Sequence, residues 1–287
     1  MIAVRQVFNG VLLCVLLLLL GACKSRQEAD KPLVAVTIAP TASLVNELSA
    51  GSLEVLTLLP RGSAPELYEP VSQELVALAQ ARAYLYVGEL GFELTWLERL
   101  EQLYPNLRLV RLGKDCYSSS GEPHRHEVGV RHDPHYWTSI RGIRLMARNT
   151  YEALRETFPE SDSLYTVRYR ALEAELIALE HDLKRQISQS GTRGFVIYHP
   201  ALTDFADEFA LEQLAIEQDG KDPGPIQLRA LVERARELGV RTVFVQQEFD
   251  QKLARSIAED LGAQVVLINP LGEDWRGELV KIVDALI

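Results

Sequence analysis

One long helical pattern near the middle of the chain constrains the fold more than any other feature. Across residues 162–190 apolar side chains recur every three to five positions, and no turn signal interrupts them. A serine or aspartate at 161–163 can cap the start of this helix, and Gly191 can end it. The recurring apolar residues are Leu164, Val167, Leu172, Leu176, Leu179 and Leu183. We expect a linking helix over 161–190 that joins two lobes; a second core helix is the alternative.

Strand-like and helix-like segments alternate on both sides of this helix. Strands are expected at 33–38, 53–59, 83–88, 107–112, 194–198, 241–247 and 264–268. Helices are expected at 43–49, 72–81, 96–104, 137–157, 204–213, 226–238, 252–261 and 277–287. Strands that alternate with helices form parallel βαβ units. The sequence therefore predicts an α/β protein with two lobes, 32–160 and 191–287, each built on a mainly parallel sheet.

The amino-terminal residues 1–22 carry a single charge, Arg5, and are otherwise almost entirely apolar. A basic start, an apolar run and small residues are typical of a secretory signal peptide, and the run is short for a membrane span. Residues 20–23, LGAC, resemble the bacterial lipoprotein box, in which an acylated Cys23 anchors the mature protein. Residues 23–31 then form a tether. We expect an extracytoplasmic protein, lipid-anchored to the cell envelope and facing the periplasm or the cell surface; the membrane leaflet stays open.

Charge and cysteine content exclude other classes of protein. Removing residues 1–22 leaves 265 of the 287 residues, roughly two domains, and moves the formal charge from −10 to −11. An acidic balance argues against nucleic acid, whose phosphates demand clustered lysine and arginine, and mildly favours cationic ligands. Cys14 leaves with the signal and Cys23 carries lipid, so the remaining Cys116 cannot form a disulfide framework. The role of Cys116 stays open between metal ligand, nucleophile and ordinary loop thiol.

Four of the six histidines lie in one stretch, residues 122–137, EPHRHEVGVRHDPHYW. They are His124, His126, His132 and His135. In open α/β sheets ligands bind at the carboxyl ends of strands, and this stretch follows the expected strand 107–112. The polar residues that follow three other expected strands are Glu66 and Glu69, His199 and Asn269. A single histidine in such a place is more often a packed core residue. Imidazole and carboxylate together at several strand ends favour a zinc or manganese site.

Five short motifs occur in a fixed order along the mature chain. They are GSAPELYEP at 62–70, DPHYW at 133–137, YHPA at 198–201, GKDP at 220–223 and NPLG at 269–272. Together they resemble the metal-binding solute receptors of bacterial ABC importers for zinc and manganese, the cluster A-I or cluster 9 family. The family patterns for the first two are Gly-x-x-x-His-x-Tyr-Glu-Pro and Asp-Pro-His-x-Trp. The resemblance covers nearly the whole mature chain and favours the zinc branch.

The resemblance implies a metal cleft between the two lobes. It assigns Glu66 and His135 of the first lobe and His199 of the second as ligands of one divalent transition metal ion, zinc first. The protein would capture the ion with high affinity and deliver it to the permease of an ABC importer, as a monomer and without catalysis. An accessory loop at the mouth of the cleft would contain His124, His126 and His132.

Two positions depart from the family pattern. Glu66 stands in place of the first histidine, and Asn269 in place of an aspartate. Two nitrogens and a carboxylate are the donor set of many zinc sites, yet the oxygen donor also admits manganese or iron. Either the carbonyl of Asn269 or water fills the fourth position. The alternative is therefore a manganese or iron receptor, or a metal-binding surface adhesin of the same fold.

A zinc hydrolase is the remote alternative. A His-Glu-x-x-His helix is absent, because His126-Glu127 is followed by Val128, Gly129 and Val130. No Gly-x-Ser-x-Gly elbow occurs either. The sequence therefore predicts a binding protein with no catalytic residues.

Overall fold

The computed structural model describes residues 31–65, 68–114, 133–217 and 220–287. Residues 32–287 form one compact unit. The predicted signal peptide 1–22, the lipidation site Cys23 and the lone Cys116 lie outside the described residues. Within the described part of the chain, no helix is both long enough and apolar enough to cross a membrane.

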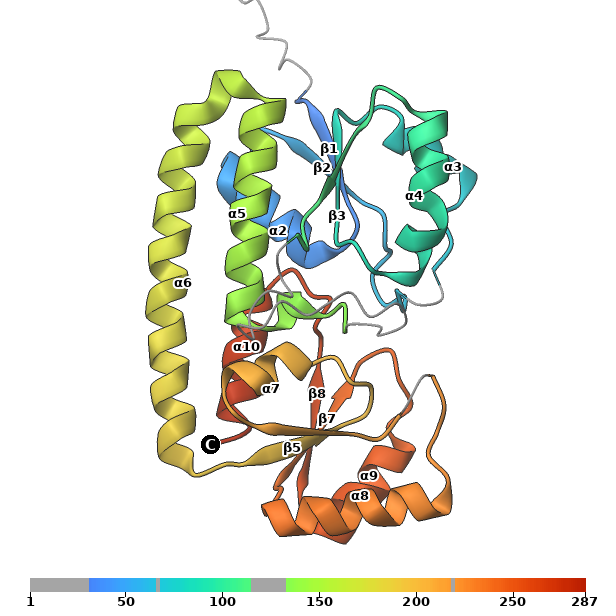
Figure 1. Cartoon of the computed structure of the whole chain (residues 1–287), viewed down its shortest axis with the longest axis vertical. Coiled ribbons are helices and arrows are strands. Elements are labelled where there is room, and N and C mark those ends of the chain that lie inside the picture. Colours follow the sequence, from blue (N-terminus) through green and yellow to red (C-terminus); the bar gives the residue numbers. More distant parts are fainter. Residues whose placement is uncertain (1–30, 66–67, 115–132, 218–219) are drawn as a thin grey trace, which may run out of the picture. The chain divides into compact units, whose positions relative to one another are not determined.

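Two four-stranded sheets, each wholly parallel, form the centre of the fold (Figure 1). The first contains β1 (Leu33–Val36), β2 (Glu54–Thr57), β3 (Ala83–Tyr86) and β4 (Arg108–Arg111). The second contains β5 (Gly194–Ile197), β6 (Glu212–Ala215), β7 (Thr242–Gln246) and β8 (Gln264–Ile268). The strand orders are β2-β1-β3-β4 and β6-β5-β7-β8, so the second sheet repeats the topology of the first. The predicted α/β class with two mainly parallel sheets is confirmed.

Helices cover both faces of each sheet. In the first lobe they are α2 (Ala39–Ser49), α3 (Ser72–Leu78), α4 (Gly91–Leu103) and α5 (Ile140–Thr157), with short 3-10 turns η1 (Tyr136–Thr138) and η2 (Pro159–Ser161). After the long α6 (Asp162–Ser190) come α7 (Thr203–Glu208), α8 (Pro225–Leu238), α9 (Lys252–Leu261) and α10 (Trp275–Asp284). Strand residues alternate between the two faces. Val34 and Val36 share a core with α2 and α5, whereas Ala35 shares one with α3 and α4.

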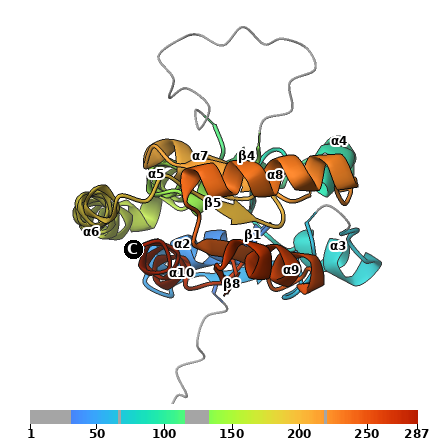
Figure 2. The same cartoon turned by 90° about the horizontal axis from the view of Figure 1, so that it is seen from below.

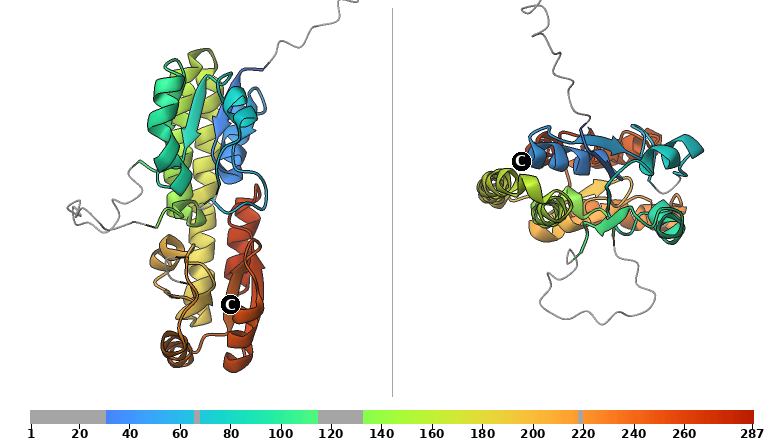
Figure 3. Two further views of the ribbon diagram at one scale, coloured as in Figure 1. Left: turned by 90° about the vertical axis from the view of Figure 1, so that its right-hand side faces the viewer. Right: turned by 90° about the horizontal axis from the view of Figure 1, so that it is seen from above.

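The helix predicted over 162–190 is confirmed as α6, which leads from the first lobe into β5. It ends where Gly191 takes a left-handed backbone angle, φ +71°, that glycine adopts without strain. α6 packs against α2 and α5 of the first lobe and against α10 of the second. Figure 2 and the right-hand view of Figure 3 show it end-on beside α5. One continuous hydrophobic core therefore passes through α6 from one sheet to the other.

The segment after β5 differs from the prediction. A single helix was expected over 204–213, but α7 ends at Glu208 and β6 begins at Glu212. Ala210 takes a left-handed backbone angle, φ +54°, which ends the helix and turns the chain back to the sheet. Gly194 allows the two strands to meet there, because a Cβ on it would lie 2.4 Å from the carbonyl oxygen of Glu212. The strand order then reverses between β5 and β7, where open α/β sheets bind ligands at their carboxyl edge.

Candidate metal centre

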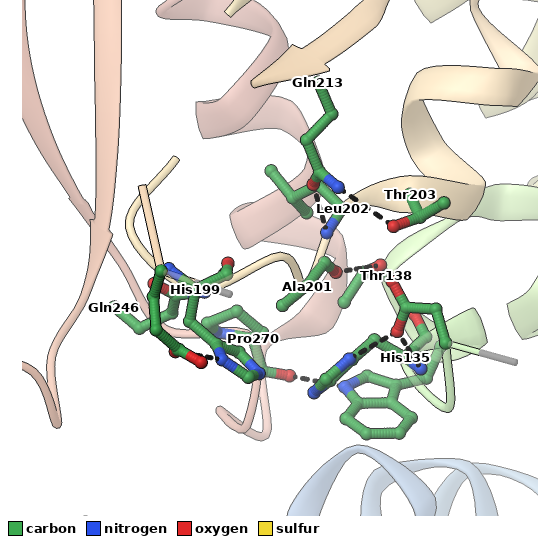
Figure 4. A network of polar contacts seen from close by, with 12 residues as sticks. His135, Thr138, His199, Ala201, Leu202, Thr203, Gln213, Gln246 and Pro270 are labelled. Atoms are coloured by element: carbon green, nitrogen blue, oxygen red, sulfur yellow. Dashed lines mark hydrogen bonds and ion pairs between the residues drawn. The ribbon is translucent and has the colours of Figure 1, made fainter. Parts of the chain in front are cut away.

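The two histidines expected to bind metal from opposite lobes lie side by side. His135 immediately precedes η1, and His199 is the second residue after β5. Their ring centroids are 5.2 Å apart, with the ring planes at 81° (Figure 4). His135 is 8% exposed, and the side chain of His199 is 16% exposed. The fold thus brings together two imidazoles that are 64 residues apart in the chain.

The backbone of His199 is held by the last residue of β7. The buried amide of Gln246 donates to the His199 carbonyl oxygen at 2.7 Å and accepts from the His199 N–H at 3.4 Å. The loop that follows is tied to β6, where Gln213 accepts from the Leu202 N–H and donates to Thr203, both at 2.9 Å (Figure 4). Both neighbours of β5 in the sheet therefore fix the segment that carries His199.

The ring of His199 is oriented by a buried carboxylate. Its Nδ1 lies 2.7 Å from Oε2 of Glu217, whose side chain is 7% exposed. An ionised carboxylate only accepts hydrogen bonds, so Nδ1 carries the proton and Nε2 keeps the lone pair suited to a metal ion. The other oxygen of Glu217 accepts the Gly220 N–H, which fixes the carboxylate in turn. Sequence reasoning missed Glu217, because no strand was predicted over 212–215 and the predicted helix 204–213 overlapped its first two residues.

The ring of His135 has the same kind of support. Oδ1 of Asp133 lies 2.5 Å from His135 Nδ1 and accepts the backbone N–H of His135 at 3.0 Å. Burial raises the pKa of the Asp133 carboxyl, but its interactions with His135 outweigh burial and hold that pKa below its ordinary value. Asp133 is thus negatively charged at neutral pH. Asp133, two residues before His135 in the chain, therefore orients this imidazole.

Residues next to His135 join the two lobes directly. The indole N–H of Trp137 donates to the carbonyl oxygen of Pro270 at 2.9 Å. The hydroxyl of Thr138 contacts the carbonyl oxygens of His135 at 2.7 Å and Ala201 at 2.8 Å. Trp137 is 1% exposed, as expected for a side chain that fills the lobe interface. These bonds fix the distance between the segments that carry the two imidazoles.

A pocket opens beside the paired rings. Its lining residues are Pro65, His135, Trp137, His199, Ala201, Gln246, Glu248, Phe249, Pro270 and Leu271. Phe249 stacks on His199, with ring centroids 5.3 Å apart and planes at 17°. Asn269 does not line the pocket. Its backbone N–H donates to the side chain of Glu278 at 2.8 Å, and its backbone carbonyl oxygen accepts from the Gly272 N–H at 3.0 Å. Glu248 does line it, and the strand-end rule applied to 241–247 would have found it.

The described residues do not contain a complete coordination shell. Within the four described ranges, no three side chains of His, Cys, Asp or Glu are close enough together to hold one metal ion. The predicted ligand Glu66 lies outside those ranges, as do the accessory histidines His124, His126 and His132. The structure therefore shows two adjacent imidazoles, each bonded to a carboxylate, at the edge of a pocket.

Comparison with known proteins assigns the family. The family model described as "Zinc-uptake complex component A periplasmic" matches residues 34–285. The zinc-binding lipoprotein AdcA of Streptococcus pneumoniae serotype 4 is 26% identical over 273 residues, which cover 90% of this chain and 54% of AdcA. This chain therefore spans about half the length of that relative. The metal ABC transporter substrate-binding lipoprotein SloC of Streptococcus mutans is 27% identical over 89% of this chain and 86% of its own.

A solved structure agrees with the sequence comparisons. A zinc-bound ZnuA deletion mutant is 31% identical, with a TM-score of 0.77 over 90% of this chain and 98% of its own. The resemblance predicted from the five motifs is thereby confirmed. The chain belongs to the ZnuA family of zinc-uptake complex components.

Proposed function

We propose that this protein captures one divalent transition metal ion outside the cytoplasm, zinc foremost, and delivers it to the permease of an ABC importer. The observation that supports this most is the pairing of His135 and His199, 5.2 Å apart and contributed by different lobes. Each has Nδ1 bonded to a carboxylate. Carboxylate–histidine pairs of this kind orient imidazoles and make them stronger metal ligands.

Zinc is favoured by the nitrogen donors. Neutral imidazole suits zinc, and the proposed set of Glu66, His135 and His199 supplies two nitrogens and one carboxylate, as in many zinc sites. Zinc binding by AdcA and by the ZnuA mutant supports the same choice. A manganese or iron cargo is the second candidate, because carboxylate oxygen is a harder donor. Membership of a family of binding proteins, rather than enzymes, also argues against a hydrolase.

The other predicted site residues and properties stay predictions within this proposal. Asn269 stays a predicted ligand, although the residues after it, Pro270 and Leu271, are the ones that line the pocket. The accessory loop with His124, His126 and His132 stays a prediction, as do lipid attachment at Cys23 and the monomeric state.

The proposal is tested by metal titration of purified protein after removal of all metal with a chelator. We expect one zinc ion per chain, held more tightly than manganese in a competition assay. His199→Ala should lose more affinity than the roughly 10–100-fold typical of removing an outer-shell partner. His181→Ala is the matched control, since His181 is exposed on α6. Equal affinities for His199→Ala and the control would refute a site at the paired histidines.

A further inference from the structure

Both paired imidazoles are flanked by aromatic rings. Trp137 lies against His135, with ring centroids 5.1 Å apart and planes at 58°, and Phe249 stacks on His199 at 5.3 Å and 17°. The Nδ1 atoms of both histidines bind carboxylates, so Nε2 is the nitrogen through which each ring would bind an ion. The Nε2 atom of His199 is buried from solvent. Each imidazole thus presents its metal-binding nitrogen beside an aromatic side chain rather than beside open water.

Apolar side chains form most of the described lining of the pocket beside these rings. They come from both lobes, and among the described lining residues only Gln246 and Glu248 add polar groups to the two histidines. The space that they enclose is about that of one water molecule. Apolar walls offer water no hydrogen bonds, so an ion in this pocket cannot keep a shell of waters. The apolar lining residues are Pro65, Trp137, Ala201, Phe249, Pro270 and Leu271.

Phe249 is held in place on several sides. Its backbone N–H donates to the Gln246 carbonyl oxygen at 3.2 Å, which closes the turn after β7. Its ring packs on His199 and also on Tyr198, where the ring centroids are 5.2 Å apart. Phe249 is half-buried and contacts the hydrophobic core of the second lobe. The ring is therefore a fixed wall of the pocket.

The small space discriminates between ions by the number of donors that they need. Zinc is satisfied by four donors, whereas manganese favours six, mainly carboxylate oxygen and water. The two imidazoles and the proposed carboxylate of Glu66 leave zinc one position, which a single water can fill. Six-coordinate manganese needs at least two waters, even where the carboxylate binds through both oxygens. The pocket has no room for the second water.

We propose that Phe249 is a specificity-determining residue, whose ring limits the water ligands of the captured ion and so favours zinc over manganese. This inference rests on the proposed function and adds no ligand to it. Phe249 covers His199, the imidazole that the second lobe contributes, and the contacts that hold its ring are present without an ion. Truncating the ring opens space beside His199, which water fills and from which it can reach the ion.

The test compares Phe249→Ala and Phe249→Leu with Tyr104→Ala, which truncates a half-buried aromatic side chain on the α3–α4 side of the first sheet. In competition titrations, the preference for zinc over manganese should fall at least about tenfold in Phe249→Ala. Phe249→Leu keeps part of the bulk and should give an intermediate value, and Tyr104→Ala should keep the wild-type preference. Visible absorption of the cobalt-loaded protein should be intense in the wild type, as in four-coordinate sites, and weaker in Phe249→Ala.

The possible failures are distinguishable. A wild-type protein that binds neither zinc nor manganese refutes the proposed function itself. If the wild type binds zinc and His199→Ala does not, an unchanged zinc preference and cobalt absorption in Phe249→Ala overturn the role of Phe249. Equal weakening of zinc and manganese binding also overturns it, because a merely structural role lowers both, and so does a wild type that prefers manganese. Thermal unfolding of the metal-free variants shows whether each is folded, and Phe249→Leu decides the question if Phe249→Ala is not.

Discussion

Each of the paired imidazoles is hydrogen-bonded to a carboxylate, but the two carboxylates come from different distances along the chain. Asp133 belongs to the same short motif as His135, two residues away. Glu217 comes from the end of a neighbouring strand, 18 residues after His199. Local support of the first kind can be expected from a motif. Support of the second kind depends on the pairing of β5 with β6, which places Glu217 beside His199.

Glu217→Gln should therefore weaken metal binding without removing a ligand. An amide carries no charge and can present its N–H₂ to Nδ1, which disfavours the tautomer that binds metal. We expect zinc affinity to fall about 10–100-fold. Glu237→Gln is the control, because the side chain of Glu237 is 67% exposed on α8. Histidine ¹⁵N NMR of the metal-free protein should show the changed tautomer. An unaltered His199 spectrum together with wild-type affinity would refute the role of Glu217.

Asp204, a residue near the lobe interface, makes the stability of the fold depend on pH. Burial raises the pKa of Asp204 to about 6, against the opposing effect of Arg141, 3.6 Å away. The folded state then binds this proton more tightly than the unfolded state, so the ionised carboxylate destabilises the fold above about pH 6. Asp204→Asn should raise the free energy of unfolding by roughly 1–2 kcal/mol at pH 8, after allowance for solvent screening. The gain should disappear toward pH 4 in urea titrations. Asp207→Asn, exposed on the same helix, should stay within about 0.5 kcal/mol at both pH values.

Among the secondary-structure elements, α6 was predictable and β6 was not. No glycine or proline interrupts 162–190, so local propensity and tertiary packing agree there. The segment 212–215, EQLA, has ordinary helix-forming residues, and only its pairing with β5 makes it a strand. This one error also concealed Glu217, which follows β6. Within α6 the pattern indicated the helix but not its buried face, since Leu172 is 1% exposed and Val167 66% exposed.

Two apolar positions on α6 should consequently respond differently to truncation. Leu172→Ala leaves a cavity in the core and should lower the free energy of unfolding by about 2–5 kcal/mol. Val167→Ala removes exposed methyl groups and should stay within about 0.5 kcal/mol. Urea denaturation of the two variants measures both values. A large loss for Val167→Ala would mean that a partner covers this face of α6.

At the scale of the whole molecule, the two lobes are joined by contacts that the motifs could not indicate. The order of motifs identified the family, and strand alternation indicated two parallel sheets. The continuous core through α6 and the bonds of Trp137 to Pro270 and of Thr138 to Ala201 depend on how the two sheets are set against one another. Because these contacts already join the lobes, we expect capture of an ion to require a small closure rather than a wide one.

An ion pair across the lobes tests whether they unfold as one unit. Nη2 of Arg276 on α10 lies 2.8 Å from both carboxylate oxygens of Glu47 on α2, and both side chains are largely buried. Arg61 and Glu273 also join the lobes at 2.7 Å, but their side chains are 85% and 60% exposed. Removing one partner of a largely buried pair leaves the other charge poorly solvated, whereas water replaces an exposed partner.

Arg276→Ala should therefore lower the free energy of unfolding by about 1–3 kcal/mol. Arg61→Ala should lower it by less than about 1 kcal/mol. In both variants a single urea transition, identical by tryptophan fluorescence and circular dichroism, is expected, because the shared core keeps the lobes coupled. Two separate transitions in Arg276→Ala would show that the ion pair, rather than the core through α6, makes the lobes cooperative. The same result would make a wider opening of the lobes accessible in the metal-free protein.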